Sequence, residues 1–206
     1  MSEPLRVGVL ASGRGSNFRA LVEAAERGRM AAAVVVLVTD RAEAPVLAIA
    51  REHRIEAVVV DPRQHPSREA HEKAVIAALE ERRVGLVCLA GYMRLLSPGF
   101  VAHFRGRLLN IHPSLLPAFP GLHPQRQALE HGARVSGATV HFVDDGVDTG
   151  PIVLQAAVPV RPDDTEATLA DRILVEEHRL YPEAVRLFAL GRLEIRGRRV
   201  QIRETP

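Results

Sequence analysis

The stretch Leu108-Leu109-Asn110-Ile111-His112-Pro113-Ser114 places two polar side chains where an apolar strand ends. Side chains alternate between the two faces of a strand, so Asn110 and His112 are expected on the same face, roughly 7 Å apart. Pro113 fixes its own φ and keeps His112 out of the helical region. Ligands of open α/β sheets bind at the carboxyl ends of strands, which makes the pair a candidate site. A strand end whose polar side chains are simply satisfied by neighbours is the alternative interpretation.

The sequence before this stretch alternates between apolar runs and helical segments. Strands that are apolar along their whole length are typical of a parallel sheet covered by helices on both faces. The pattern therefore predicts a doubly wound α/β fold with a mostly parallel sheet. The predicted strands are 5–10, 34–38, 57–60 and 84–90, and the predicted helices are about 18–27, 44–53 and 67–83.

The second half is less regular and predicts antiparallel additions to the same sheet. A strand over 107–111 is followed by a proline-rich loop, 113–123, and a short helix through Leu129. The remaining predicted elements are neighbouring strands at 135–143 and 152–160, a long helix capped near Thr165, and a small hairpin over 193–202.

Bulk composition is that of an ordinary globular domain. The 206 residues are 47% hydrophobic and 25% charged, and the formal net charge is +2. The longest apolar run, 31–38, is too short to span a bilayer, and a predicted strand follows the first four residues too closely for a signal peptide. We therefore expect one domain over 1–206, a cytoplasmic location, and no nucleic-acid or membrane partner. The sequence does not distinguish a monomer from a homodimer.

Cys88 is the only cysteine, which excludes an internal disulfide and a cysteine metal cluster. It lies in the apolar run 84–90, where we expect it to pack in the core. A nucleophilic thiol is the alternative. No metal site is expected.

The loop Ser12-Gly13-Arg14-Gly15-Ser16-Asn17 joins the first predicted strand to the first predicted helix. Such a loop exposes backbone N–H groups at the positive end of a helix dipole, which suits an anion and most often a phosphate. The third glycine of a dinucleotide fingerprint and the Gly-Lys-Ser/Thr of a triphosphate loop are both missing. A monophosphate bound by Gly15, Ser16 and Asn17 fits better than a dinucleotide. A tight turn that needs glycine only for its geometry is the alternative.

Two further loops follow strands of the predicted sheet. In the segment 91–98, Met93, Leu95 and Leu96 are suited to line a cleft for a flat heterocycle, although such residues are also typical of ordinary core. The segment 144–151 is acidic, but it lacks the spacing of a calcium loop. A solvated turn is one interpretation of it. A carboxylate facing His112, which would favour the imidazolium, is the other.

The four segments 12–17, 91–94, 110–117 and 144–151, in this order and spacing, resemble the glycinamide ribonucleotide formyltransferases, which are folate-dependent enzymes of purine biosynthesis. The run Asn-Ile-His-Pro-Ser-Leu-Leu-Pro with a downstream Asp is shared by the wider superfamily of folate formyltransferases and hydrolases. The glycine-rich N-terminal loop is shared by a narrower group of these enzymes. It separates this chain from methionyl-tRNA formyltransferases, which open with a different loop.

The resemblance implies a Rossmann-like formyltransferase fold, with a phosphate-binding half at about 1–105 and a catalytic and folate-binding half at about 106–206. It implies glycinamide ribonucleotide as the substrate and 10-formyltetrahydrofolate as the cosubstrate, with no metal. Without the resemblance, Arg68 would be interpreted as a surface arginine, and Glu177 as an acid at the margin of an apolar helix stripe. The implied roles are catalysis by Asn110, His112 and Asp148, phosphate binding by Gly15, Ser16 and Asn17, contact with the ribose by Glu177, and folate binding by Arg68, Met93, Arg94, Leu95, Leu96 and Asp144.

The implied reaction is direct attack of the substrate amine on the formyl carbon. Asn110 and a protonated His112 are expected to stabilise the tetrahedral oxyanion, while Asp148 keeps His112 charged and helps to move the proton. Two alternatives stay open. One is a related enzyme that transfers the formyl group to another acceptor or hydrolyses 10-formyltetrahydrofolate, and the other is a non-catalytic phosphate-binding domain.

Overall fold

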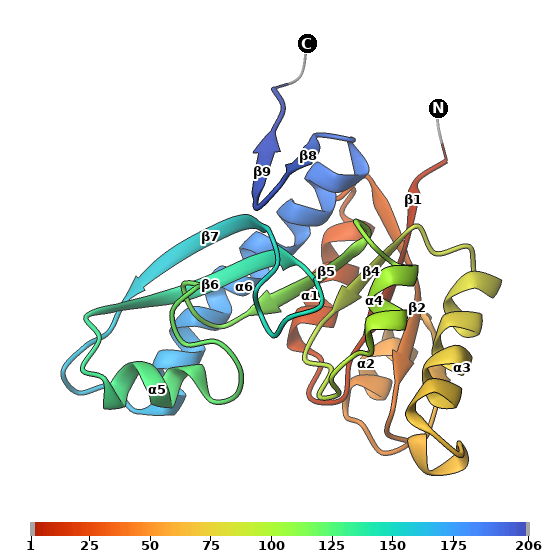
Figure 1. Ribbon diagram of the computed structural model, residues 1–206, viewed down its shortest axis with the longest axis horizontal. Helices are drawn as coiled ribbons and strands as arrows, with labels where there is room; N and C mark the ends of the chain where they lie inside the picture. The colour runs from red at the N-terminus through yellow and green to blue at the C-terminus, as the bar shows by residue number, and fades with distance from the viewer. Residues whose placement is uncertain (1–2, 205–206) are drawn as a thin grey trace.

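The computed structural model describes residues 3–204, and within this range the strands form one nine-stranded sheet in the order β3-β2-β1-β4-β5-β6-β7-β9-β8 (Figure 1). The strands are β1 (Leu5–Leu10), β2 (Ala32–Thr39), β3 (Glu56–Val59), β4 (Leu86–Leu89), β5 (Leu108–His112), β6 (Val135–Phe142), β7 (Ile152–Pro159), β8 (Leu193–Arg196) and β9 (Arg199–Ile202). The helices are α1 (Ser16–Glu26), α2 (Val46–Glu52), the 3-10 turn η1 (Pro62–Gln64), α3 (Arg68–Glu81), α4 (Pro98–His103), α5 (Pro124–Glu130) and α6 (Glu166–Ala189).

The predicted doubly wound fold is confirmed, including its antiparallel additions. Strands β3, β2, β1, β4 and β5 are parallel, whereas β6 pairs antiparallel with both β5 and β7. The chain moves outward from β1 to β3 and then returns to β4 on the other side of β1. A crevice opens at such a switch point, at the carboxyl ends of the strands. The loops after β1, β4 and β5 therefore meet at one edge of the sheet.

The central strands β1, β2, β4, β5 and β6 are mostly buried because they are apolar along most of their length. Val7 and Val9 of β1 belong to a core formed with α1, α2 and α6, whereas Leu10 belongs to a second core formed with α3 and α4. In the ribbon, α6 runs behind the sheet while α3 and α4 lie on the near side (Figure 1). Two apolar layers thus hold the strand ends, and the loops they carry, in fixed positions.

Helix α1 begins at Ser16, earlier than the predicted start near residue 18. Gly15 precedes it in the left-handed region with φ of 80°, a conformation that glycine adopts without steric cost. Ser16 and Asn17 therefore belong to the first helical turn, whose N–H groups have no partner inside the helix. Strand β5 similarly extends to His112 rather than ending at residue 111, and the short helix α4 was not predicted.

Helix α6 is fastened to the sheet by both apolar packing and a buried hydroxyl. Thr165 and Thr168 form a capping box at its start, as the predicted cap near Thr165 suggested, and the helix continues through Pro182. The hydroxyl of Tyr181 lies 2.9 Å from the carbonyl oxygen of Leu89 and 3.0 Å from that of Leu109, and it donates its hydrogen toward this pair. None of the helices within residues 3–204 has the length and apolar character needed to cross a membrane.

Candidate active site

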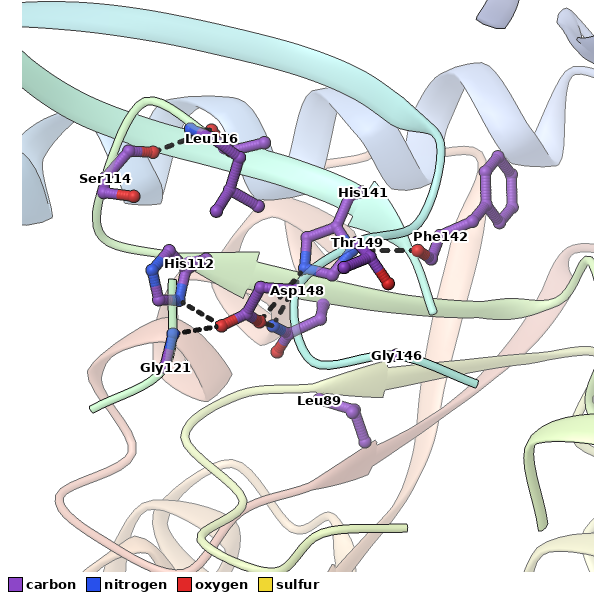
Figure 2. Close-up of polar contacts among 12 residues, drawn as sticks. Leu89, His112, Ser114, Leu116, Gly121, His141, Phe142, Gly146, Asp148 and Thr149 are labelled. Atoms are coloured by element: carbon purple, nitrogen blue, oxygen red, sulfur yellow. Dashed lines mark hydrogen bonds and ion pairs between the residues drawn. The ribbon is translucent and has the colours of Figure 1, made fainter. Parts of the chain in front are cut away.

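His112 faces Asp148, which the chain places in the loop after β6 (Figure 2). Asn110 faces the same carboxylate. The Nδ1 atom of His112 lies 3.3 Å from Oδ2 of Asp148, and the Nδ2 atom of Asn110 lies 3.4 Å from Oδ1 of the same carboxylate. The strand period thus puts both side chains on one face, as predicted. Two side chains, one of them 38 positions away in the sequence, thus converge on the Asp148 carboxylate.

Asp148 is held by its own backbone and by a neighbouring loop. Its φ is 55°, in the left-handed region, which is uncommon for any residue other than glycine and marks local strain. The backbone N–H of Gly121 donates to Oδ2 at 2.8 Å. Burial raises the pKa of Asp148, but the neighbouring His141, the Gly121 N–H and His112 together bring that pKa below 3.8. The carboxylate is therefore ionised at neutral pH.

Both ring nitrogens of His112 face hydrogen-bond acceptors. Nε2 lies 2.9 Å from the carbonyl oxygen of Phe119, and Nδ1 faces Asp148. Burial lowers the pKa of His112 more than the Phe119 carbonyl and Asp148 raise it, so the pKa lies below 6.5. Burial thus acts against the imidazolium expected from the sequence, whereas Asp148 and the Phe119 carbonyl favour it. A neutral ring has one N–H for two acceptors, and the site gains its second hydrogen bond only when it takes up a proton.

These directions predict how stability depends on pH. Burial lowers the pKa of three histidines, His112, His71 and His178, below 6.5. Such groups bind fewer protons in the folded protein than in the unfolded chain, so their contribution to stability is lost as the pH falls below about 6.5. Glu177 acts in the opposite sense, because burial raises its pKa. We expect the unfolding midpoint temperature to fall between about pH 7 and pH 5, and to fall more steeply in Glu177→Gln. A midpoint in that variant that stayed constant or rose would contradict the assigned directions.

Asn17 and Glu177, both predicted to bind substrate, are brought together by the packing of α1 against α6. Nδ2 of Asn17 donates to Oε2 of Glu177 at 2.7 Å, although 160 positions separate them in the sequence. Oδ1 of Asn17 is buried and has no hydrogen-bond partner. Burial raises the pKa of Glu177 more than Asn17 and Arg14 lower it. A polar pair with one open acceptor thus lies beside the first turn of α1.

The loops after β1 and β4 are linked by backbone contacts. The N–H of Ser12 donates to the carbonyl of Gly91, and the N–H of Met93 donates to Oγ of Ser12, each at 3.1 Å. Met93 and Leu95 are 70% and 71% exposed, which suits the predicted cleft lining. Leu96 instead packs, partly buried, against the core formed with α3 and α4.

Two polar members of the predicted folate set, Arg68 and Asp144, have partners within the protein. Arg68 donates to Oε1 of Glu72 at 3.2 Å and to the carbonyl of Leu95 at 2.6 Å, so it lies against the loop after β4 rather than free in solvent. Asp144 accepts hydrogen bonds from the Gly146 N–H and the Thr149 hydroxyl, which shapes its own loop. Arg94 is half-buried.

Sequence reasoning missed His141, which is buried beside Asp148 (Figure 2). Its ring also contacts Asn110. The alternation over 135–143 indicates which residues share a face of β6. It does not indicate that His141 pairs with Asn110 across the strands, which depends on the register. The loop that supplies the Phe119 carbonyl and the Gly121 N–H was also missed, because backbone groups leave no signal in a sequence.

Other chemistries find less support in the side chains that the structure places. Within residues 3–204, no group of three or more His, Cys, Asp or Glu side chains is arranged to bind a metal ion. Cys88 is fully buried, and burial raises the pKa of its thiol to about 12, so it packs as a core residue, as predicted.

Comparison with known proteins gives a family match over most of the chain. The model of the formyl transferase family matches residues 5–185. A phosphoribosylglycinamide formyltransferase of Mycobacterium tuberculosis is 47% identical over 207 residues, and the match covers 98% of this chain and 95% of that protein. A trifunctional purine biosynthetic protein adenosine-3 of Drosophila pseudoobscura pseudoobscura is 48% identical over 94% of this chain, which spans 14% of the length of that relative.

A solved structure is similar over nearly the whole fold. The crystal structure of glycinamide ribonucleotide transformylase 1 from Symbiobacterium toebii has a TM-score of 0.97 and 54% sequence identity. The match covers 99% of this chain and 96% of that chain. The order and pairing of the strands described above are therefore those of a known architecture.

Proposed function

This chain belongs to the formyl transferase family, and from that premise we propose that it transfers a formyl group from 10-formyltetrahydrofolate to the amine of glycinamide ribonucleotide, a step of purine biosynthesis. One observation carries the proposal most directly. Asn110 and His112 converge on the ionised, conformationally strained Asp148 at the switch point of the sheet. The relatives that match this chain over nearly their full length are named for this reaction.

The chemistry needs proton transfer and charge stabilisation but no enzyme nucleophile. The substrate amine attacks the formyl carbon, and the carbonyl electron pair moves to oxygen to give a tetrahedral oxyanion. The attacking nitrogen loses a proton, the bond between carbon and the folate nitrogen breaks, and that nitrogen takes up a proton. The products are the formylated ribonucleotide and tetrahydrofolate. A buried site with an ionised carboxylate and a neutral imidazole is suited to accept and return that proton.

We assign the transfer of the proton to His112 and Asp148, and the stabilisation of the oxyanion to Asn110. When His112 takes up a proton, both its N–H groups have acceptors, in the Phe119 carbonyl and Asp148. The resulting imidazolium lies next to the developing negative charge, and its electrostatic stabilisation of that charge is largest because the site is buried. Asn110 supplies a neutral amide donor on the same face of β5. The charged state expected from the sequence is thus reached during the reaction rather than before it.

The folate is assigned to the exposed apolar side chains around the crevice. Met93 and Leu95 follow β4, Leu122 follows β5 and Val147 lies in the loop that carries Asp148, and all four are more than half exposed. Large apolar side chains exposed together at one sheet edge are suited to stack on a flat heterocycle. Arg68 lies beside Leu95 and is assigned to the acidic tail of the cosubstrate.

The ribonucleotide is assigned to the other side of the switch point. Its phosphate fits the open N–H groups of Gly15, Ser16 and Asn17 at the start of α1. We assign Glu177 to accept hydrogen bonds from the ribose hydroxyls, and Oδ1 of Asn17 can accept a hydrogen bond from them as well. In this arrangement the half at about 1–105 binds the phosphate, and the half at about 106–206 supplies the catalytic residues.

Consumption of 10-formyltetrahydrofolate tests the proposed function. We expect spectrophotometric loss of the cosubstrate to depend on glycinamide ribonucleotide, with one formylated product formed for each cosubstrate consumed. Glycinamide without the ribose phosphate is the matched control acceptor, and we expect it to react far more slowly because remote binding energy is lost. Consumption without any acceptor would instead indicate a hydrolase. Absence of any consumption would indicate a non-catalytic phosphate-binding domain.

A further inference from the structure

We propose that His141 is a positioning residue, which holds the side-chain amide of Asn110 in the orientation that catalysis needs. The proposal rests on the proposed function, because it assigns a role within the same reaction. His141 lies on β6 directly across from Asn110 on β5, and its side chain is 2% exposed. Cross-strand partners have Cβ atoms about 4.5–5.5 Å apart, so the register of two central strands fixes this contact.

The hydrogen bonds of the His141 ring assign its tautomer. Nδ1 lies 2.8 Å from the carbonyl oxygen of Phe142 (Figure 2). A carbonyl oxygen only accepts hydrogen bonds, so Nδ1 carries the hydrogen and donates it. In the neutral ring Nε2 is then an acceptor, and it lies 3.1 Å from Nδ2 of Asn110, whereas Oδ1 of Asp148 is farther away, at 3.6 Å. The Phe142 carbonyl therefore makes Nε2 an acceptor for the Asn110 amide.

These contacts select one of the two orientations of the Asn110 amide. The Nδ2 group has two hydrogens, and its neighbours are two acceptors, Nε2 of His141 and Oδ1 of Asp148. In the flipped orientation the amide oxygen would face a lone pair and a carboxylate, which is repulsive. His141 thereby holds one hydrogen of the amide, and the other hydrogen, whose contact with Asp148 is long, is the one left to donate to the oxyanion. Asp148 alone would orient the Asn110 amide only weakly, because its contact with Nδ2 is 3.4 Å long.

Two substitutions test the roles of the two imidazole nitrogens of His141 separately. In His141→Asn the side-chain amide retains a donor near the position of Nδ1 but leaves the Nε2 position empty. In His141→Gln the longer side chain places a polar atom near the Nε2 position. We expect His141→Asn to lower kcat about tenfold with little change in either KM, which is the size of one lost hydrogen bond. We expect His141→Gln to restore most of that loss.

A double-mutant cycle with Asn110→Ala tests whether His141 acts through Asn110. Once the amide is gone, its orientation no longer matters, so we expect His141→Asn to change kcat less than about twofold in that background. A full tenfold loss in the Asn110→Ala background would overturn the proposal, because His141 would then act by itself or through the general packing of β6.

A spectroscopic measurement keeps this inference separate from the proposed function. Long-range proton–nitrogen correlation spectra of the wild-type chain are expected to show His141 with hydrogen on Nδ1. The side-chain amide signals of Asn110 are expected to move in His141→Asn and to return toward their wild-type positions in His141→Gln. Hydrogen on Nε2, or unmoved Asn110 signals, would overturn the proposal. Loss of the proposed formyl transfer with these signals as expected would refute the activity and leave the assigned geometry intact.

Discussion

Replacing Asn110 with alanine is expected to lower kcat about 10²- to 10³-fold and to leave the KM for glycinamide ribonucleotide within a few-fold of the wild-type value. The reason is that Asn110 belongs to the face of β5 that carries His112, whereas we assign the phosphate to other residues, in the loop at the start of α1. A donor that acts on the oxyanion contributes chiefly in the transition state. Its loss therefore appears in turnover rather than in binding of the ribonucleotide.

His112→Ala is expected to show a loss of the same size in the same measurement, steady-state kinetics with both substrates varied. The matched control is His103→Ala, since His103 lies on α4, where its ring contacts the exposed Glu80 carboxylate at 2.9 Å. That control is expected to retain wild-type kcat. Near-normal turnover in either Asn110→Ala or His112→Ala would contradict the catalytic assignment, whereas a rise in the ribonucleotide KM alone would move the residue to substrate binding.

The limits of sequence reasoning are clearest at β5 and β6. Alternation along β5 is a property of the backbone, so it predicted that Asn110 and His112 share a face before any tertiary contact was known. The partner of Asn110 on β6 depends on the register of an antiparallel pair, which the alternation of β6 does not determine. The catalytic role proposed for Asp148 came from the family resemblance, since its loop alone was also consistent with a solvated turn.

The protonation of His112 shows a second limit. Its carboxylate partner was expected, and opposite charge does favour the imidazolium. The larger effect is burial of the ring, to which the loop containing Phe119 and Gly121 contributes by folding over β5. Desolvation is a sum over the whole environment, so no local pattern in the sequence reports it. The partial burial of Leu96, which was expected to line the folate cleft, could not be predicted for a related reason, because its packing against the second core depends on where α3 and α4 lie.

The loop 144–151, which carries Asp148, is also expected to be highly sensitive to substitution at Gly150, near the start of β7. An added Cβ at this position would lie closer than 3.0 Å to the carbonyl group of Phe142, and that group is backbone, so it cannot move aside as a flexible side chain would. The N–H of Phe142 donates to the carbonyl of Pro151 at 2.9 Å, which holds the two segments together. Gly150→Ala must therefore separate them, at an expected cost of about 1–3 kcal/mol in the free energy of unfolding.

The same displacement acts on Asp148, which lies two residues before Gly150 and already has a strained backbone. A shift of about 1 Å at a catalytic group costs about 10²-fold in rate, so Gly150→Ala is expected to lose turnover as well as stability. Urea unfolding and steady-state kinetics measure the two effects. Gly99→Ala is the matched control, because a Cβ there would come no closer than 3.6 Å to the Ser97 hydroxyl. Wild-type turnover in Gly150→Ala would show that Asp148 does not depend on the close approach of this loop to β6, and that the contacts of Gly121 and His112 are sufficient to position it.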